Sequence, residues 1–390
     1  MLAAAVPEID VIISGHSHTR LETPITVGNT LIVSCGGHGY DLGFLRLVRD
    51  GNRFRESAYE LIPIRENIIK DAEIERAILA YRELVNRQYL SLFDYSYGDV
   101  LAYTEFDFTT IEQYWDKQGE DSLGNLISDS YIAAVKIAEG DRYRNVDIAV
   151  VPTGVVRGSF PRGIITVADA FKVSSLGIGA DNTPGYPLVS IYLTGRELKT
   201  AAEIDVSVST LMAEARLSIS GLSYTYNPNR LLLNRVTDVR LMNPDGSFSE
   251  IDDNKLYRIV SGLYSCQMLG VVEAQSFGLL KIAPKDENGI PIVDFEDHII
   301  YDDNGRELKE WIALAHYLQS FTTVNGIPRV PDFYNQLHGR KIENNSRSLI
   351  ALLEKPNKIF FLLLGVVFLL LAIITASACL IFYLVRRRYK

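Results

Sequence analysis

The chain has 390 residues, 47% of them hydrophobic and 22% charged, which suits two or three globular units and excludes a disordered or fibrous protein. Its formal net charge of −9 argues against a nucleic-acid partner, because binding a phosphate backbone requires clustered lysine and arginine. Three scattered cysteines are too few for a disulfide framework. We expect buried thiols, with a Cys35–Cys266 bridge as the alternative.

The first part of the chain predicts short strands and one helix. An apolar run from Ile9 to Ile13 ends in the letters SGHSHT, which is typical of a buried strand followed by a polar loop. Further strands are expected at Thr30–Ser34, Gly43–Val48 and Phe54–Pro63. From Ile68 to Leu90, apolar residues recur at helical spacing with charges between them, so we predict an amphipathic helix that connects two domains.

From Gly98 onwards, strand and helix patterns alternate, as in a larger α/β or α+β unit. The predicted strands lie at 98–108, 146–154, Leu188–Leu193, Leu217–Tyr226 and Leu256–Ser261. The predicted helices lie at Gly124–Gly140, after a capping Thr166, at Gly195–Ile204 and at Leu308–Phe321.

The C-terminal segment has the length and composition of a membrane-spanning helix. No charged residue occurs from Ile359 to Val385, and about 20 apolar residues are enough to cross a hydrocarbon core. More basic residues follow this segment than precede it: Arg386, Arg387, Arg388 and Lys390 against Lys355 and Lys358. The positive-inside rule therefore predicts a cytoplasmic C-terminus and an extracellular location for the bulk of the chain.

The first residues lack the basic region and the long apolar run of an export signal. An exported chain needs such a signal, so we expect a further segment upstream of Met1.

His16 and His18 are the sharpest candidates for chemistry. Two imidazoles two residues apart, in a loop after a buried strand, can each offer a ring nitrogen to a metal ion. The alternative is a pair of exposed loop histidines. The other four histidines, His38, His298, His316 and His338, are interpreted as structural.

The sequence resembles the 5'-nucleotidase / 2',3'-cyclic-nucleotide phosphodiesterase family from about Val6 to Ile342. The segment around GHSH is similar to the last motif of a calcineurin-like metallophosphoesterase domain, G-H-x-[HQN]. The later blocks GNLISD, VVPTGVVRG, ITVADAFKV, LTGREL, SGLSYTY and GRKI follow the order of the family's C-terminal domain. The ordered set is far more specific than any one block.

The resemblance implies an α/β and α+β architecture with one transmembrane helix. The expected parts are a C-terminal remnant of a metallophosphoesterase β-sandwich at 1–63, a linker helix at 64–92, the substrate-binding C-terminal domain at 93–345, a stalk at 346–357, the membrane helix at 358–385 and a basic cytoplasmic tail at 386–390.

The family resemblance also implies a hydrolase of nucleotides or related phosphomonoesters, active in nucleotide catabolism with two divalent metal ions, Zn or Mn. His16 and His18 would each serve one metal. The other ligands belong to D-x-H, G-D and G-N-H-[ED] blocks, which are expected upstream of Met1 or in a separately encoded N-terminal domain. We therefore expect no catalytic residue in this chain, and no activity from it alone.

The resemblance assigns substrate binding to Gly154, Arg157, Lys117 and Tyr264. Arg157 and Lys117 would neutralise a phosphate, and Tyr264 lies near an aromatic clamp position; the alternatives are surface cations and an ordinary packed ring. The base-recognition blocks depart from the family pattern, for example in Ser175–Ile178, which replaces P-F-G-N. These departures favour a phosphoester other than AMP, or an inactive membrane-tethered binding domain as the second hypothesis.

Overall fold

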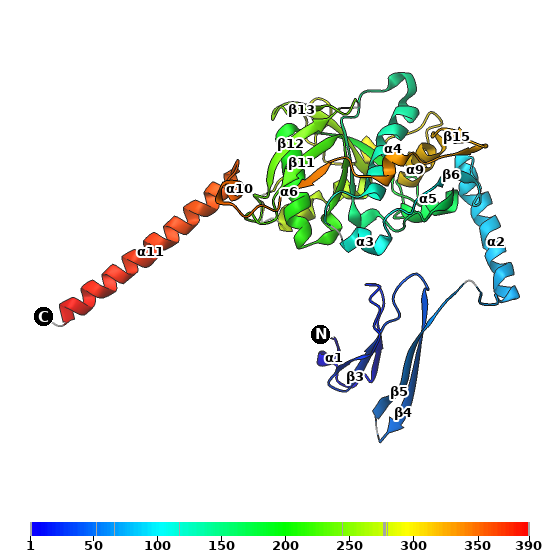
Figure 1. The fold of residues 1–390 in the computed structure, drawn as a ribbon, viewed down its shortest axis with the longest axis horizontal. Coiled ribbons are helices and arrows are strands. Elements are labelled where there is room, and N and C mark those ends of the chain that lie inside the picture. The colour runs from blue at the N-terminus through cyan, green and yellow to red at the C-terminus, as the bar shows by residue number, and fades with distance from the viewer. Residues whose placement is uncertain are drawn as a thin grey trace. The chain divides into compact units, whose positions relative to one another are not determined.

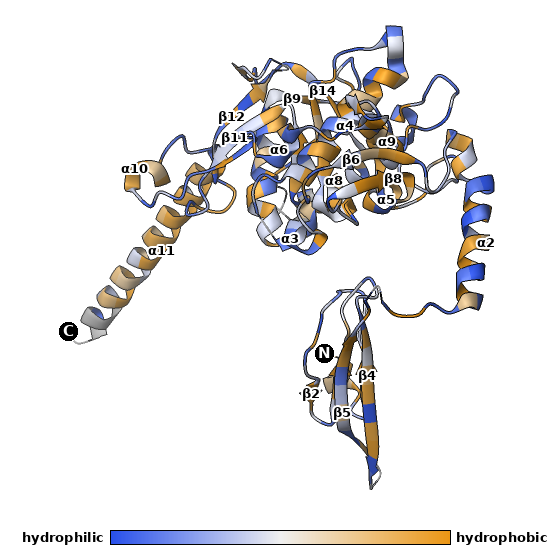
Figure 2. Ribbon diagram, turned by 45° about the vertical axis from the view of Figure 1, so that its right-hand side comes forward, coloured by the Kyte–Doolittle hydropathy of each residue, from blue (hydrophilic) through white to orange (hydrophobic). Residues whose placement is uncertain are grey.

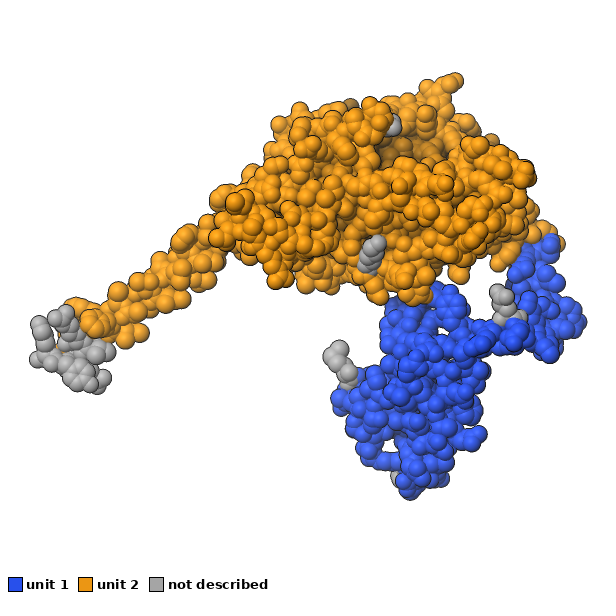
Figure 3. Space-filling model, in the orientation of Figure 1, with its two compact units in different colours: residues 1–83 blue, residues 84–390 orange. Residues whose placement is uncertain are grey.

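The computed structural model describes residues 2–51, 53–65, 67–116, 118–243, 245–275, 278 and 280–388. The chain divides into two compact units, residues 1–83 and 84–390, which Figure 3 colours separately. Each unit is described by itself.

The first unit consists of two small sheets and short connections. Strand β1 (Val11–Ile13) pairs in parallel with β3 (Thr30–Val33), which pairs with β2 (Ile25–Val27) in the opposite direction. Strands β4 (Asp41–Asp50) and β5 (Arg53–Pro63) form a long antiparallel hairpin. The unit also contains the short helix α1 (Leu2–Ala5) and most of α2 (Ala72–Gln88).

This unit buries little apolar surface. Among its described residues, the buried apolar side chains are Ala3, Leu31 and Val33. By contrast, Leu42 and Phe44 of the hairpin are exposed, as is Ile78 of α2. Burial of apolar area is the main stabilising contribution to a fold, so this unit has a small core of its own.

A four-stranded sheet organises the second unit, in the order β10-β7-β14-β9. These strands are β10 (Leu217–Ser220), β7 (Ile148–Pro152), β14 (Leu256–Gly262) and β9 (Leu188–Thr194). The central strands β7 and β14 run parallel, and the two outer strands pair antiparallel to them.

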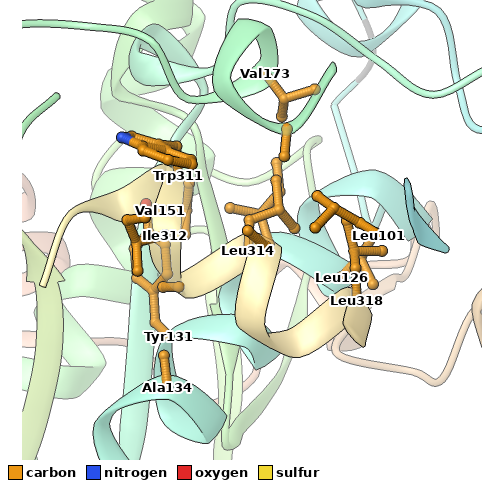
Figure 4. Packing of buried hydrophobic residues seen from close by; sticks show 14 of the residues in the cluster. Leu101, Leu126, Tyr131, Ala134, Val151, Val173, Trp311, Ile312, Leu314 and Leu318 are labelled. Carbon is orange, nitrogen blue, oxygen red and sulfur yellow. The ribbon is translucent and has the colours of Figure 1, made fainter. Parts of the chain in front are cut away.

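Both faces of this sheet are covered. Ala149, Val151 and Val260 join one hydrophobic cluster, with α4 (Ser122–Glu139) and α9 (Glu310–Gln319) packed over it (Figure 4). The alternate residues Ile148 and Ile259 join a second cluster with α6 (Gly195–Ser207). Successive side chains of a strand point to opposite faces, which explains why β7 is a continuous apolar run and why β14 carries apolar residues on both faces.

A second sheet has the order β13-β12-β11-β17. Its strands are β11 (Leu222–Tyr226), β12 (Val236–Met242), β13 (Phe248–Glu250) and β17 (Lys341–Glu343). Two strand pairs complete the described sheets, β6 (Val100–Thr104) with β8 (Gly163–Thr166) and β15 (Thr323–Val324) with β16 (Ile327–Pro328). The remaining α-helices are α3 (Ile111–Asp116), α5 (Val167–Val173), α7 (Leu263–Gln267), α8 (Leu269–Gln275), α10 (Leu349–Leu352) and α11 (Lys358–Arg388).

The prediction of one strand over Leu217–Tyr226 is wrong. The chain forms two strands there, β10 and β11, and they belong to different sheets. Gly221 separates them with φ +80°, and a Cβ at this position would lie 2.0 Å from the Asp147 carbonyl oxygen. Only glycine adopts this conformation at so close a backbone approach without strain.

Helix α11 is apolar from Ile359 to Tyr383 (Figure 2). Within the described part of the chain, it is the one helix long and apolar enough to cross a membrane. All three cysteines are free thiols, and of these Cys266 is buried as expected, whereas Cys35 is half-buried and Cys379 exposed. Cys35 and Cys266 belong to different units, so a bridge between them stays a prediction.

Thr166 caps α5, as the sequence predicts. Its Oγ1 accepts a hydrogen bond from the Asp169 backbone N–H at 3.3 Å, and Asp169 Oδ2 accepts one from the Thr166 N–H at 2.9 Å. We expect Thr166→Ala to lower the free energy of unfolding by about 0.5–2 kcal/mol, because it leaves a helix N–H without its partner.

Urea unfolding followed by tryptophan fluorescence measures this change. Thr200→Ala is the matched control, since Thr200 Oγ1 only donates back to the Arg196 carbonyl inside α6. An equal loss in both variants would show that the cap does not stabilise α5.

Candidate functional site

The two predicted metal ligands lie in the loop after β1. The Ser14 N–H donates to the Val33 carbonyl oxygen at 2.8 Å, so pairing with β3 continues just past the end of the strand. His16 and His18 then adopt positive φ angles of 61° and 53°. Histidine is among the few residues besides glycine that enter this region. Both side chains are exposed.

His18 contacts His38, for which the sequence predicts a structural role. The rings of His18 and His38 meet edge to face, with their centroids 4.8 Å apart, and His38 also has a positive φ of 58°. Gly37 permits this approach, because a Cβ there would lie 2.6 Å from Cγ of His18. The structure thus places His38 beside one of the two candidate ligands.

These residues do not fit a metal ion by themselves. Across the residues that the structure describes, no group of three or more His, Cys, Asp or Glu side chains is placed to hold a metal. A divalent zinc or manganese ion takes about four to six ligands. His16 and His18 would therefore need ligands from outside this set.

The candidate substrate-binding residues lie together in the second unit. A cavity of about 490 Å³ is lined by Gly154, Arg157 and Tyr264, among others. Gly154 follows β7 directly and Tyr264 follows β14 directly. Since β7 and β14 are parallel neighbours, their carboxyl ends meet at one edge of the sheet, where α/β proteins commonly bind ligands.

Arg157 is exposed at the edge of this cavity, and its guanidinium lies 5.6 Å from the centre of the Trp115 ring. A guanidinium that lies over an aromatic ring can still donate its N–H groups to an anion. Gly154 contacts the opposite wall closely, because a Cβ there would come within 3.0 Å of Cβ of Glu214. The predicted Lys117 lies outside the described residues.

Tyr264 is stacked on a ring that sequence reasoning missed, Tyr186. Their centroids are 5.3 Å apart and their planes 14° apart. Burial raises the pKa of Tyr186, and the neighbouring Tyr264 and Glu310 add to this effect. Gly177, with φ +77°, makes room for the Tyr186 ring, because a Cβ there would lie 2.1 Å from Cζ of Tyr186. The glycine alone does not indicate this contact in the sequence.

A buried carboxyl group lies near the helix that carries Tyr264. Glu310 is fully buried, and burial raises its pKa to about 8. A Cβ on Gly262, which ends β14, would clash with its Oε1 at 1.7 Å. The Tyr131 hydroxyl lies close enough to the Glu310 carboxyl for each group to affect the pKa of the other. Burial also raises the pKa of the cavity-lining Cys266 thiol to about 12.

Comparison with known proteins identifies the second unit. Residues 100–272 match the model of the 5'-nucleotidase C-terminal domain. The chain is 26% identical over 266 residues to the trifunctional nucleotide phosphoesterase protein YfkN of Bacillus subtilis, and 28% identical over 283 residues to a 5'-nucleotidase-related protein of Glossina morsitans morsitans. The chain belongs to the 5'-nucleotidase family. The matched cavity residues Gly154, Arg157 and Tyr264 all fall within its C-terminal domain.

Solved structures share the fold of this 5'-nucleotidase family member. A 5'-nucleotidase precursor from Thermus thermophilus is 24% identical with a TM-score of 0.58, covering 86% of this chain and 60% of that one. The sulfate thiohydrolase SoxB of Thermus thermophilus is 18% identical with a TM-score of 0.51, covering 89% of this chain and 54% of that one. The match to YfkN covers 67% of this chain and 17% of YfkN. The match to the Glossina protein covers 65% of this chain and 47% of that protein, so the chain spans less than half the length of these relatives.

Proposed function

We propose that this chain is the substrate-binding part of a 5'-nucleotidase-type metallophosphoesterase that hydrolyses nucleotides or related phosphomonoesters. The observation that carries the proposal is the grouping of Gly154, Arg157 and Tyr264 around one cavity, at the carboxyl ends of two parallel strands within the matched domain. An exposed arginine at the edge of a largely apolar cavity suits a substrate with an anionic group and a less polar body.

The proposed metal centre is shared with another segment. His16 and His18 would hold metal together with ligands from a complementary metal-binding segment, which belongs either to the same polypeptide or to a separate one. The small core of the first unit and the exposed Leu42 and Phe44 of its hairpin support this proposal, because such a unit gains stability by packing against further chain. When bound, the metals would polarise the phosphate.

The same residues support a second candidate function. Because the described residues alone do not complete a metal site, the chain could also act as a membrane-tethered domain that binds a phosphorylated ligand without hydrolysing it. Finding metal-dependent phosphate release from the protein isolated from its own cells would exclude this candidate.

The membrane location is part of the proposal. Helix α11 would cross the bilayer once, with the basic residues after Val385 in the cytoplasm and residues 1–357 outside the cell. Accessibility of introduced cysteines to a membrane-impermeant reagent on intact cells tests this orientation. Labelling at the C-terminus but not in residues 84–357 would reverse it.

Arg157 tests the substrate site. We expect Arg157→Ala to weaken binding of a phosphomonoester such as AMP or p-nitrophenyl phosphate by about 10-fold or more, since a charged hydrogen bond contributes roughly 1.5–3 kcal/mol. The affinity of Arg157→Lys should lie between those of the wild type and Arg157→Ala, because lysine keeps the charge and loses the bidentate geometry. Equilibrium binding to the full chain in lipid nanodiscs provides the measurement.

Arg162→Ala is the matched control for this experiment. Arg162 is an exposed arginine on the same connection, and its guanidinium lies 3.6 Å from the Glu105 carboxylate rather than on the cavity wall. If the wild-type chain and Arg157→Ala bound the phosphomonoester with equal affinity, the Arg157 side chain would lie outside the phosphate site. The proposal would then lose its main support.

A further inference from the structure

The walls of the cavity at Arg157 are almost entirely apolar. The sheet contributes apolar side chains from each of its four strands, and α6, α8 and several loop segments supply the rest. These apolar residues include Val150, Ile191, Leu193, Leu217, Ile259, Ala201, Ile204, Met212, Leu269 and Ile282. A volume of about 490 Å³ is in the range of sites that enclose a small molecule.

The described residues offer a nucleoside few polar groups in this cavity, and Ser265 Oγ, which is buried there without a hydrogen-bond partner, can bind one ligand atom. Ser261 Oγ already donates to the Val150 carbonyl oxygen at 2.8 Å, and the Cys266 thiol is a weak donor whose raised pKa keeps it neutral. The charged groups of the lining are Arg157 and Glu214. Each ring nitrogen or ribose hydroxyl buried without a partner would cost about 1–3 kcal/mol.

The Tyr186 and Tyr264 rings leave no space between them for a nucleobase. A planar ring sandwiched between Tyr186 and Tyr264 would need their ring planes about 7 Å apart, because each stacked contact takes roughly 3.5 Å. The centroids are 5.3 Å apart and the two rings already stack on each other. They form part of the cavity wall rather than a clamp for a purine.

The cavity wall continues into the start of the apolar helix α11. Ile204 and Ala215 line the cavity and also belong to a small buried cluster, against which Ile359 of α11 packs. The Asn357 side chain fixes this junction by donating to the Leu233 carbonyl oxygen at 2.6 Å. The apolar lining is therefore continuous with the point at which the chain would enter a bilayer.

We infer that the cavity holds the apolar body of an amphiphilic phosphomonoester, such as an alkyl or lipid phosphate, with its phosphate at Arg157. The inference rests on the phosphate site proposed above and names the class of compound that this site takes. Glu214, beside Gly154, repels an anion on its side of the rim, so the phosphate approaches from the Arg157 side. Burial of methylene groups then contributes affinity that a nucleoside cannot obtain.

Photolabelling tests this inference on the full chain in phosphatidylcholine nanodiscs, since detergent would compete for an apolar cavity. The probe is decyl phosphate with a diazirine at the end of its chain, and labelled peptides are identified by mass spectrometry. We expect labelling of β9 or α6, protection by unmodified decyl phosphate, and little protection by AMP. Decanol should protect about 10-fold less well, because it lacks the charge that Arg157 binds.

Two variants fill the cavity from different elements. Ala201→Phe on α6 and Met212→Phe on the facing segment should each lower labelling by about 10-fold, the effect of losing burial of two methylene groups. Ala133→Phe is the control, because Ala133 lies on α4 and is not part of the cavity wall. Thermal unfolding of each variant shows whether it is folded. If one of the two cavity-filling variants does not fold, the other still tests the inference.

The outcomes separate this inference from the proposed function. Arg157-dependent binding of AMP, with no labelling of the cavity by the alkyl probe, would overturn the amphiphile and leave the phosphate site intact. Labelling that decanol prevents as well as decyl phosphate would overturn the placement of the phosphate at Arg157. Loss of Arg157 dependence for both AMP and decyl phosphate would overturn the proposed phosphate site itself.

Discussion

His16→Ala is expected to lower metal-dependent phosphate release by at least about 100-fold. Removing even an outer partner of a metal ligand commonly costs 10- to 100-fold in affinity or activity, and loss of a direct ligand should cost at least as much. The assay uses protein isolated from the cells that make it, so that any complementary metal-binding segment is present. Metal content, measured on the same preparations, should fall in parallel.

His298→Ala is the control for this prediction. His298 belongs to the second unit, where it lines a cavity other than the one at Arg157. His38→Ala should have an intermediate effect, because it removes the ring that packs against His18 and leaves the candidate ligands themselves in place. Unchanged turnover and unchanged metal content in His16→Ala would remove this residue from the proposed centre.

Much of the second unit could be predicted because its elements are long and strongly patterned. Helix α4 repeats apolar residues at helical spacing and packs them on α9, and the apolar run of β7 is buried on both faces. Patterns of this kind report the burial of each element and need no knowledge of its neighbours.

The division at Gly221 was missed for a physical reason. The letters LSISGLSYTY alternate as one strand would, and nothing local indicates that the two halves pair with different partners. Strand β10 pairs with β7, whereas β11 pairs with β12 and β17. Pairing is decided by tertiary contacts, and the positive φ of the glycine is visible only in the structure.

The candidate site was predicted in part. Gly154 and Arg157 stand in a recognisable block, and the structure places them on one cavity with Tyr264. Tyr186 was missed because it lies 78 positions before Tyr264, and their stacking depends on how β9 and β14 pair. The closeness of His18 and His38 likewise arises from the folding of two loops that are separate in the sequence.

Glu310→Gln is expected to change how stability depends on pH. Burial raises the pKa of Glu310 from 4.5 to about 8 in the folded chain. Tyr131 of α4 and Cys266 of α7 face this carboxyl, and Tyr186 lies close enough for its own pKa to be affected by it. None of these groups carries a positive charge that would stabilise the ionised carboxylate.

The sign of the effect follows from the direction of this change. A raised carboxyl pKa means that the folded state keeps a proton that the unfolded state has released. The associated stability is fully present below pH 4.5 and is lost as the pH rises to about 8. The interval from 4.5 to 8 corresponds to on the order of 5 kcal/mol, at about 1.4 kcal/mol for each pKa unit.

Glutamine stays neutral at every pH and so removes this dependence. At pH 5 the variant should be less stable than wild type, because the amide brings two N–H donors into a buried site and each donor left without an acceptor costs about 1–3 kcal/mol. At pH 9 it should be the more stable protein, since the wild type must then bury a carboxylate. Urea unfolding, followed by the fluorescence of the adjacent Trp311, gives both differences. Glu250→Gln on β13 is the control at an exposed site and should show no such crossover. If the difference in stability between Glu310→Gln and wild type stayed constant from pH 5 to 9, the Glu310 carboxyl would ionise as readily in the folded chain as in water.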